Sequence, residues 1–113
     1  MSRQLERQVI ERARGLISRH EQWRTMVYAM DANGRRVDWC AKQAVAFCAV
    51  GALRRAAYDL SGDRNHAIMF ANKIAGRMIG IEHEGLAVIK VKFINDAKGQ
   101  AAVLRLFDTV STF

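Results

Sequence analysis

Cys48 is the residue of this sequence best suited to covalent chemistry, because a cysteine thiolate is a strong nucleophile. A cysteine-dependent hydrolase or transferase also needs a histidine as general base, and an asparagine or aspartate that orients this histidine. His66 or His83 is available as the base, and Asn95 or Asp96 is available as the orienting residue. These five residues form the candidate catalytic group.

The surrounding run AVAFCAVGALRRAA, residues 44–57, offers a structural explanation for Cys48 instead. Helical spacing places Cys48 with Ala44 and Gly51 in one stripe of small residues, where another backbone can approach closely. Free cysteine is also among the most frequently buried residue types. A glycine inside a helix costs about 1 kcal/mol relative to alanine, so close packing would explain Gly51. We therefore favour a buried, unreactive Cys48 over a catalytic one.

The sequence predicts no metal site and no cofactor. Cys40 and Cys48 lack the C-x-x-C spacing of many zinc ligands, and the three histidines are far apart without an H-E-x-x-H motif. The segment GALRRAA, residues 51–57, fits neither of the glycine-rich loops that bind phosphate groups. These absences favour a function that is not enzymatic.

The chain is strongly basic, with a formal net charge of +7 and 13 arginines against 5 lysines. Such a balance favours an anionic partner, which could be a nucleic acid, an acidic protein or a membrane surface. The charged segment MSRQLERQVIERARG, residues 1–15, does not resemble a signal peptide, and no apolar run approaches the roughly 20 residues that span a bilayer. We therefore expect a cytoplasmic protein without membrane contact. Nucleic-acid binding would depend on an arginine-rich surface comprising Arg3, Arg7, Arg14, Arg54 and Arg55.

Hydrophobic periodicity predicts an α+β fold in which about four helices pack against a single layer of small antiparallel sheet. Asn33-Gly34 is a strong turn signal and indicates a hairpin near residues 25–38. The β-branched run LAVIKVKFI indicates a strand near residues 86–94, after which Asn95 and Asp96 would close a turn or cap the last helix. The expected helices cover residues 2–20, 38 or 41 to 60, 65–79 and 103–111, all within one domain of residues 1–113.

Several segments together resemble a known family. They are ARGLISRHEQW at 13–23, AMDANGRRV at 29–37, AVAFCAVGALRRAA at 44–57, and IND followed by AAVLRLFD within 94–108. This order is similar to that of small bacterial and phage proteins catalogued as a domain of unknown function, whose most specific shared residues match Cys48, Gly51, Asn95 and Asp96. Phe47 replaces the tryptophan usual in that family, and Ala102 stands where an acidic residue often precedes V-L. The resemblance implies a shared fold and no particular activity.

These observations predict a small, non-enzymatic domain that binds a protein partner or associates with itself. The occurrence of the similar proteins in phages suggests a role linked to phages or mobile elements, such as inhibition of a host system. Two alternatives remain open, namely a cysteine-dependent hydrolase or transferase that uses Cys48, and a nucleic-acid-binding domain that uses the arginine-rich surface.

Overall fold

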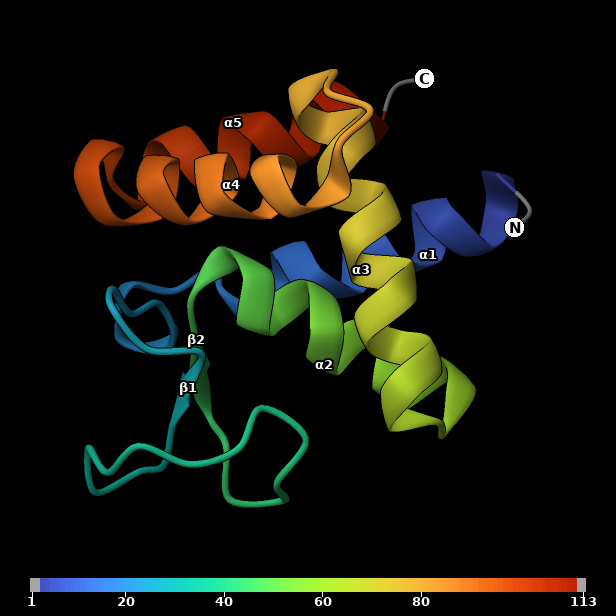
Figure 1. The fold of residues 1–113 in the computed structure, drawn as a ribbon. Coiled ribbons are helices and arrows are strands. Elements are labelled where there is room, and N and C mark those ends of the chain that lie inside the picture. Colours follow the sequence, from blue (N-terminus) through green and yellow to red (C-terminus); the bar gives the residue numbers. More distant parts are fainter. Residues whose placement is uncertain (1–2, 112–113) are drawn as a thin grey trace.

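The computed structural model describes residues 3–111 and confirms an α+β fold dominated by helices (Figure 1). Among these residues are five α-helices, one short 3₁₀ helix and a two-stranded antiparallel sheet, so there is one helix more than expected. In chain order the elements are α1 (Arg3–Leu16), η1 (His20–Gln22), β1 (Ala29–Met30), β2 (Ala46–Phe47), α2 (Ala49–Ser61), α3 (Arg64–Ile79), α4 (Glu84–Lys98) and α5 (Gln100–Ser111).

Helix α2 lies at the centre of the fold and contacts α1, α3 and α4. In Figure 1, α4 and α5 lie side by side above α2, and the two strands meet at the end where α2 begins. Ala49, Ala52 and Ala56 are fully buried, and their small side chains allow the neighbouring helices to approach closely. The largest fully buried apolar side chains are Ile10, Ile17, Phe47, Leu53, Ile74 and Phe107.

The third predicted helix, 65–79, is confirmed as α3, and local signals define both of its ends. The side chain of Asp63 caps the start by accepting a hydrogen bond from the backbone N–H of His66 at 2.9 Å. Gly80 closes the helix with a φ of 75°, a left-handed conformation that glycine adopts without steric cost. Both signals involve residues close in sequence, so the boundaries could be predicted.

The predicted strand near residues 86–94 is wrong, because this segment is the middle of helix α4. Ala87, Val88, Val91 and Asn95 are its buried residues, and their spacing of three and four is helical. The alternation of Lys90 and Lys92 with apolar residues therefore does not reflect the two faces of a strand. Tertiary packing on one side of the segment overrides its local β-propensity.

The central helix begins at Ala49 rather than near residue 38 or 41, so this boundary was also predicted wrongly. Cys48 has extended backbone angles and caps the helix, while the preceding Ala46 and Phe47 form strand β2. The first helix ends at Leu16 instead of residue 20, and residue 2 lies outside the described part. The hydroxyl of Ser18 donates to the carbonyl oxygen of Gly15 at 3.1 Å, which satisfies one of the terminal acceptors of α1.

The turn predicted at Asn33-Gly34 is present, but the hairpin near 25–38 has only a single bridge between its arms, Met30 to Arg36. Gly34 has a φ of 77°, and the Asp31 carboxylate accepts hydrogen bonds from the backbone N–H groups of Asn33 and Arg35. The sheet instead joins β1 to β2, with Ala29 opposite Phe47 and Met30 opposite Ala46. The predicted turn is therefore local, whereas the strand that pairs with β1 is much further along the chain.

Candidate functional site

Asn95 joins three separate segments of the chain at the start of α2. Its side chain lies on α4 and is completely buried. Its Oδ1 accepts hydrogen bonds from the Trp23 indole Nε1–H at 2.8 Å and from the Ala49 backbone N–H at 2.9 Å. Its Nδ2 donates to the carbonyl oxygen of Arg24 at 2.9 Å and to Oδ1 of Asp96 at 3.0 Å. Every polar atom of this buried amide is thus used.

Asp96 holds the loop beside this network in an uncommon conformation. Its Oδ1 accepts a hydrogen bond from the backbone N–H of Met26 at 3.0 Å. Met26 has a φ of 67°, which is rare for a residue other than glycine, and its side chain is 76% exposed. The sequence predicted that Asn95 and Asp96 close a turn or cap the last helix, and this prediction is wrong. They lie within α4 and attach the 23–26 loop to it.

Cys48 is buried, as expected, with 5% of its surface exposed. Its Sγ caps α2 by accepting a hydrogen bond from the backbone N–H of Gly51 at 3.3 Å. Burial raises the pKa of the thiol, and this effect outweighs the opposing effect of the hydrogen bonds from the helix. The thiol is consequently protonated at neutral pH, the unreactive form of a cysteine.

Gly51 lies where two backbones approach each other, as its place in the sequence suggested. A Cβ atom at this position would lie 2.0 Å from the carbonyl oxygen of Tyr28. The obstacle is backbone, which cannot turn away as a flexible side chain could. Gly51 thus allows the 26–28 loop to pack directly on the first turn of α2.

The structure separates both candidate histidines from Cys48. His66 lies beyond the far end of α2, beside Leu60, and a helix of that length places it about 20 Å from Cys48 along the axis. His83 caps the start of α4 through Nδ1, which accepts the backbone N–H of Leu86 at 3.2 Å. Asp96 is thirteen residues further along α4, again about 20 Å away. The five residues of the candidate catalytic group therefore do not form one site.

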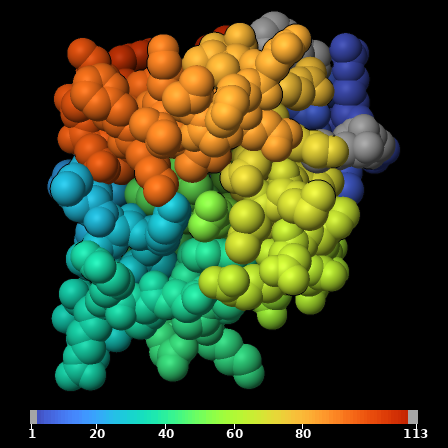
Figure 2. All heavy atoms as spheres, viewed as in Figure 1, coloured from blue at the N-terminus to red at the C-terminus, as the bar shows by residue number. Residues whose placement is uncertain are grey.

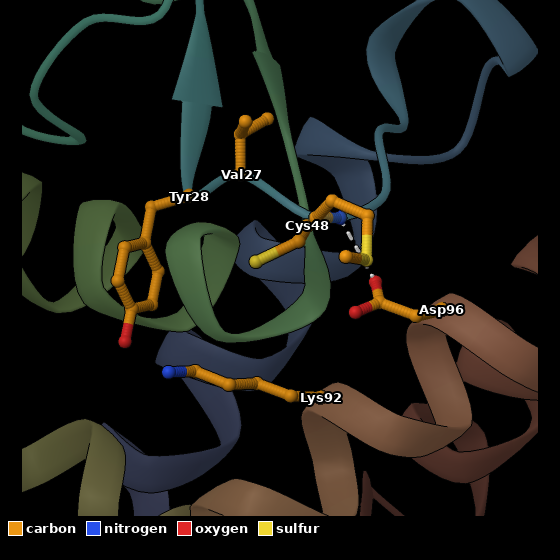
Figure 3. Close-up of a pocket in the computed structure, with 6 residues that line it drawn as sticks. Val27, Tyr28, Cys48, Lys92 and Asp96 are labelled. Carbon is orange, nitrogen blue, oxygen red and sulfur yellow. Dashed lines mark hydrogen bonds between the residues drawn. The ribbon is translucent and has the colours of Figure 1, made fainter.

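A small cavity opens between the 26–28 loop, the start of α2 and α4 (Figure 3). Its volume of about 160 Å³ resembles that of an engineered apolar cavity, about 150 Å³, that binds benzene. Two of its lining residues contact each other, since the ammonium group of Lys92 lies 4.5 Å from the centre of the Tyr28 ring. We call this space the thiol cavity. Its lining residues are Met26, Val27, Tyr28, Cys48, Lys92 and Asp96.

A row of large apolar side chains lies exposed on α4 next to the thiol cavity. Leu86, Ile89 and Phe93 have 51%, 61% and 60% of their surface exposed, and their spacing of three and four places them on one helix face. Ile89 and Phe93 each precede a cavity residue, Lys92 and Asp96 respectively, by three positions, so they lie beside the rim. We call these three residues the α4 stripe. The sequence analysis did not predict this stripe, because it assigned residues 86–94 to a strand, in which these three residues would not share one face.

The space-filling view shows a depression below α4 (Figure 2). Green atoms of α2 are visible at its floor, between the orange surface of α4 and the blue surface of the loop that precedes β1. The thiol cavity is formed by these three parts of the chain. The α4 surface above it is open to solvent in this view.

The five arginines of the predicted nucleic-acid surface are distributed over α1 and α2 and have different surroundings. Arg14 pairs with Asp108 at 2.6 Å, and Arg55 pairs with Asp59 at 3.0 Å. Arg54 lies over the Tyr28 ring. Arg3 and Arg7 lie beside Glu6 in the first half of α1. The structure thus does not gather these arginines into one surface, and two of them already bind carboxylates.

The lysines of α4 differ from these arginines. Every ion pair found within residues 3–111 is formed by an arginine. Lys90, Lys92 and Lys98 on α4 therefore have no carboxylate partner in the described part of the chain. This part also contains no group of three or more side chains placed to hold a metal ion, and none of its helices could cross a bilayer.

Comparison with known proteins places these features in a family context. A model described as "Family of unknown function (DUF6197)" matches residues 1–112. This match agrees with the resemblance noted in the sequence. No curated protein and no solved structure matches the chain.

Proposed function

Since the chain belongs to the family of unknown function DUF6197, we propose from its own surface that it is a small, non-enzymatic domain that binds an acidic protein segment along the α4 stripe. The observation that carries this proposal is the row of three exposed apolar residues on one helix face. Single exposed apolar residues are normal, but a contiguous row is typical of an interaction site. A partner helix or strand would cover Leu86, Ile89 and Phe93 together.

The charges around the stripe favour an acidic partner over a second copy of this chain. Lys90 and Lys92 flank the stripe and lack carboxylate partners within residues 3–111. Each copy carries a net charge of +7, so two copies would repel each other and would place like-charged lysines face to face. An acidic segment would instead gain from both the apolar contact and the charge.

The thiol cavity favours a protein segment over a membrane surface. It has the volume for one large apolar side chain, and such an anchor is typical of peptide recognition by a groove. We place this binding in the cytoplasm, where Cys40 and Cys48 remain reduced. A phage or mobile-element setting, with a host protein as the partner, fits the same chemistry.

Selection from a library of random peptides tests the proposal and does not require the natural partner. Peptides selected on the native protein are expected to combine acidic residues with large apolar ones. The double variant Ile89→Gln/Phe93→Gln should lose at least tenfold in affinity for them, since apolar contacts in an interface core contribute most of the binding energy. Both side chains are largely exposed, so the variant should retain the native melting temperature within a few degrees.

Met69→Gln is the matched control, because Met69 on α3 is 62% exposed but lies outside the stripe and the cavity. It should bind the selected peptides like the native protein. Equal binding by the stripe variant, or failure to select any peptide, would refute the proposal. Sedimentation of the native protein and flotation with anionic lipid vesicles examine the two other occupants. A dimer or vesicle binding that the stripe variant abolishes would replace the acidic segment with that partner.

A further inference from the structure

A second cavity lies next to the thiol cavity and has a different chemical character. Its volume is about 330 Å³, and Tyr28 belongs to the walls of both cavities. Three guanidinium groups and one carboxylate line it, which leaves two positive charges in excess. We call it the arginine cavity, and the lining residues used below are Tyr28, Arg36, Asp38, Trp39, Arg54 and Arg64.

Arg64 is the arginine of this cavity that is held in place by protein groups. Its Nη2 donates to Oδ2 of Asp38 at 3.0 Å, and its guanidinium lies 5.0 Å from the centre of the Trp39 ring. The other oxygen of Asp38 accepts hydrogen bonds from the backbone N–H and the thiol of Cys40. Asp38 thus neutralises and orients one of the three guanidinium groups.

Arg54 and Arg36 have no such partner in the described part of the chain. The guanidinium of Arg54 lies 4.8 Å from the centre of the Tyr28 ring, and its Nε is buried without a hydrogen-bond acceptor. Buried polar groups in proteins are nearly always hydrogen-bonded, so an exception calls for an explanation. The neighbouring Arg55 shows the usual arrangement, because it donates to Asp59 and to two backbone carbonyl oxygens. Arg36 is exposed and enters no ion pair within residues 3–111.

We propose that the arginine cavity binds the dianionic phosphate group of a phosphate monoester. Arginine suits this role because its planar fork of N–H donors matches phosphate oxygens in pairs. The excess of two positive charges balances a phosphate monoester, which carries about −1.5 to −2 at neutral pH. The volume is near the lower end of the range for small-molecule sites, roughly 300–1,000 Å³, so the phosphate and a small attached group would fill it.

Titration with inorganic phosphate and with phenyl phosphate, followed by NMR, tests this proposal. The Nε–H resonance of Arg54 is expected to shift during both titrations, because the bound phosphate alters the surroundings of that guanidinium. Arg36→Gln should weaken binding about tenfold or more, as expected for the loss of a charged hydrogen-bond donor. Arg54→Lys keeps the charge but loses the fork, and should also weaken binding. Phenylacetate, a monoanion of similar size, should bind more weakly than phenyl phosphate.

Arg35→Gln is the matched control, since Arg35 is the exposed neighbour of Arg36 and does not line the cavity. An equal loss of affinity in both variants would show only a general charge effect and would overturn the proposal. Absence of binding at millimolar ligand, or an unmoved Arg54 Nε–H resonance, would overturn it as well. A capped phosphoserine peptide shows whether the phosphate group comes from a protein or from a small molecule. The Ile89→Gln/Phe93→Gln variant should bind phenyl phosphate normally, which keeps this test independent of the α4 stripe.

Discussion

Replacing Asn95 with alanine should strongly destabilise the protein, because one buried amide serves four hydrogen bonds. The substitution would leave the Trp23 indole N–H and the Ala49 backbone N–H without their acceptor. It would also leave the carbonyl oxygen of Arg24 without its donor. A buried donor or acceptor that loses its partner costs about 1–3 kcal/mol.

The magnitude follows from how accessible these orphaned groups are to water. Asn95 is fully buried and Ala49 is fully buried, so the N–H of Ala49 should bear the whole cost. Trp23 and Arg24 are partly exposed, and water can replace part of their lost hydrogen bonds. Together with the cavity left by the removed side chain, we expect a loss of about 3–5 kcal/mol in the free energy of unfolding. Such a loss is a large part of the stability of an ordinary domain, about 5–15 kcal/mol.

Urea denaturation followed by circular dichroism measures this loss. Asn65→Ala is the control, because Asn65 is exposed in the first turn of α3, and its effect should remain within about 0.5 kcal/mol. A loss below about 1 kcal/mol for Asn95→Ala would refute the reasoning, since water would then satisfy the groups that the amide serves. An unchanged denaturant slope would show that the two variants unfold between the same states.

Four further predictions concern Gly51 and the two cysteines. Gly51→Ala should cost more than about 3 kcal/mol because its Cβ meets the Tyr28 carbonyl, whereas Gly15→Ala, with open space around it, should stabilise slightly in the same denaturation assay. Cys48→Ala should cost about 1 kcal/mol, because it removes a buried thiol and the Sγ that caps α2; unchanged or increased stability would contradict this role of the thiol. Iodoacetamide should label the partly exposed Cys40 before the buried Cys48, as mass spectrometry of the folded protein would reveal. Because burial raises the pKa of Cys48, the free energy of unfolding should fall as pH rises above roughly 8.5, where only the unfolded chain releases that proton; Cys48→Ala should reduce this slope.

The features that the sequence predicted correctly depend on residues near one another along the chain. Asp63 and Gly80 delimit α3 because a cap and a left-handed residue act within one helical turn. The turn at Asn33-Gly34 follows from a similarly local signal. Cys48 is buried as expected, but the helical stripe with Ala44 that led to this prediction is wrong, because α2 begins at Ala49. The family resemblance is also confirmed by the match over residues 1–112.

The role of Asn95 could not be predicted in the same way. Its partners Ala49 and Trp23 are 46 and 72 residues away in sequence, so no local pattern records these hydrogen bonds. An Asn-Asp pair after an apolar run has a simpler local explanation as a turn or cap, so the sequence predicts that role instead. The predicted start of α2 is wrong for a related reason, because Ala46 and Phe47 pair with β1, which lies earlier in the chain.

The wrong strand prediction for residues 86–94 and the proposed function both depend on the apolar outer face of α4. A surface helix normally has a polar outer face, which gives its sequence a clear helical period. In α4 the inner face buries Ala87 and Val91 while the outer face exposes Leu86, Ile89 and Phe93, so apolar residues occur on both sides and the period disappears. Such a sequence is more consistent with a helix covered on both faces than with one covered on a single face. Within residues 3–111 nothing covers the outer face, and the partner segment that we propose would supply the contact that this pattern lacks.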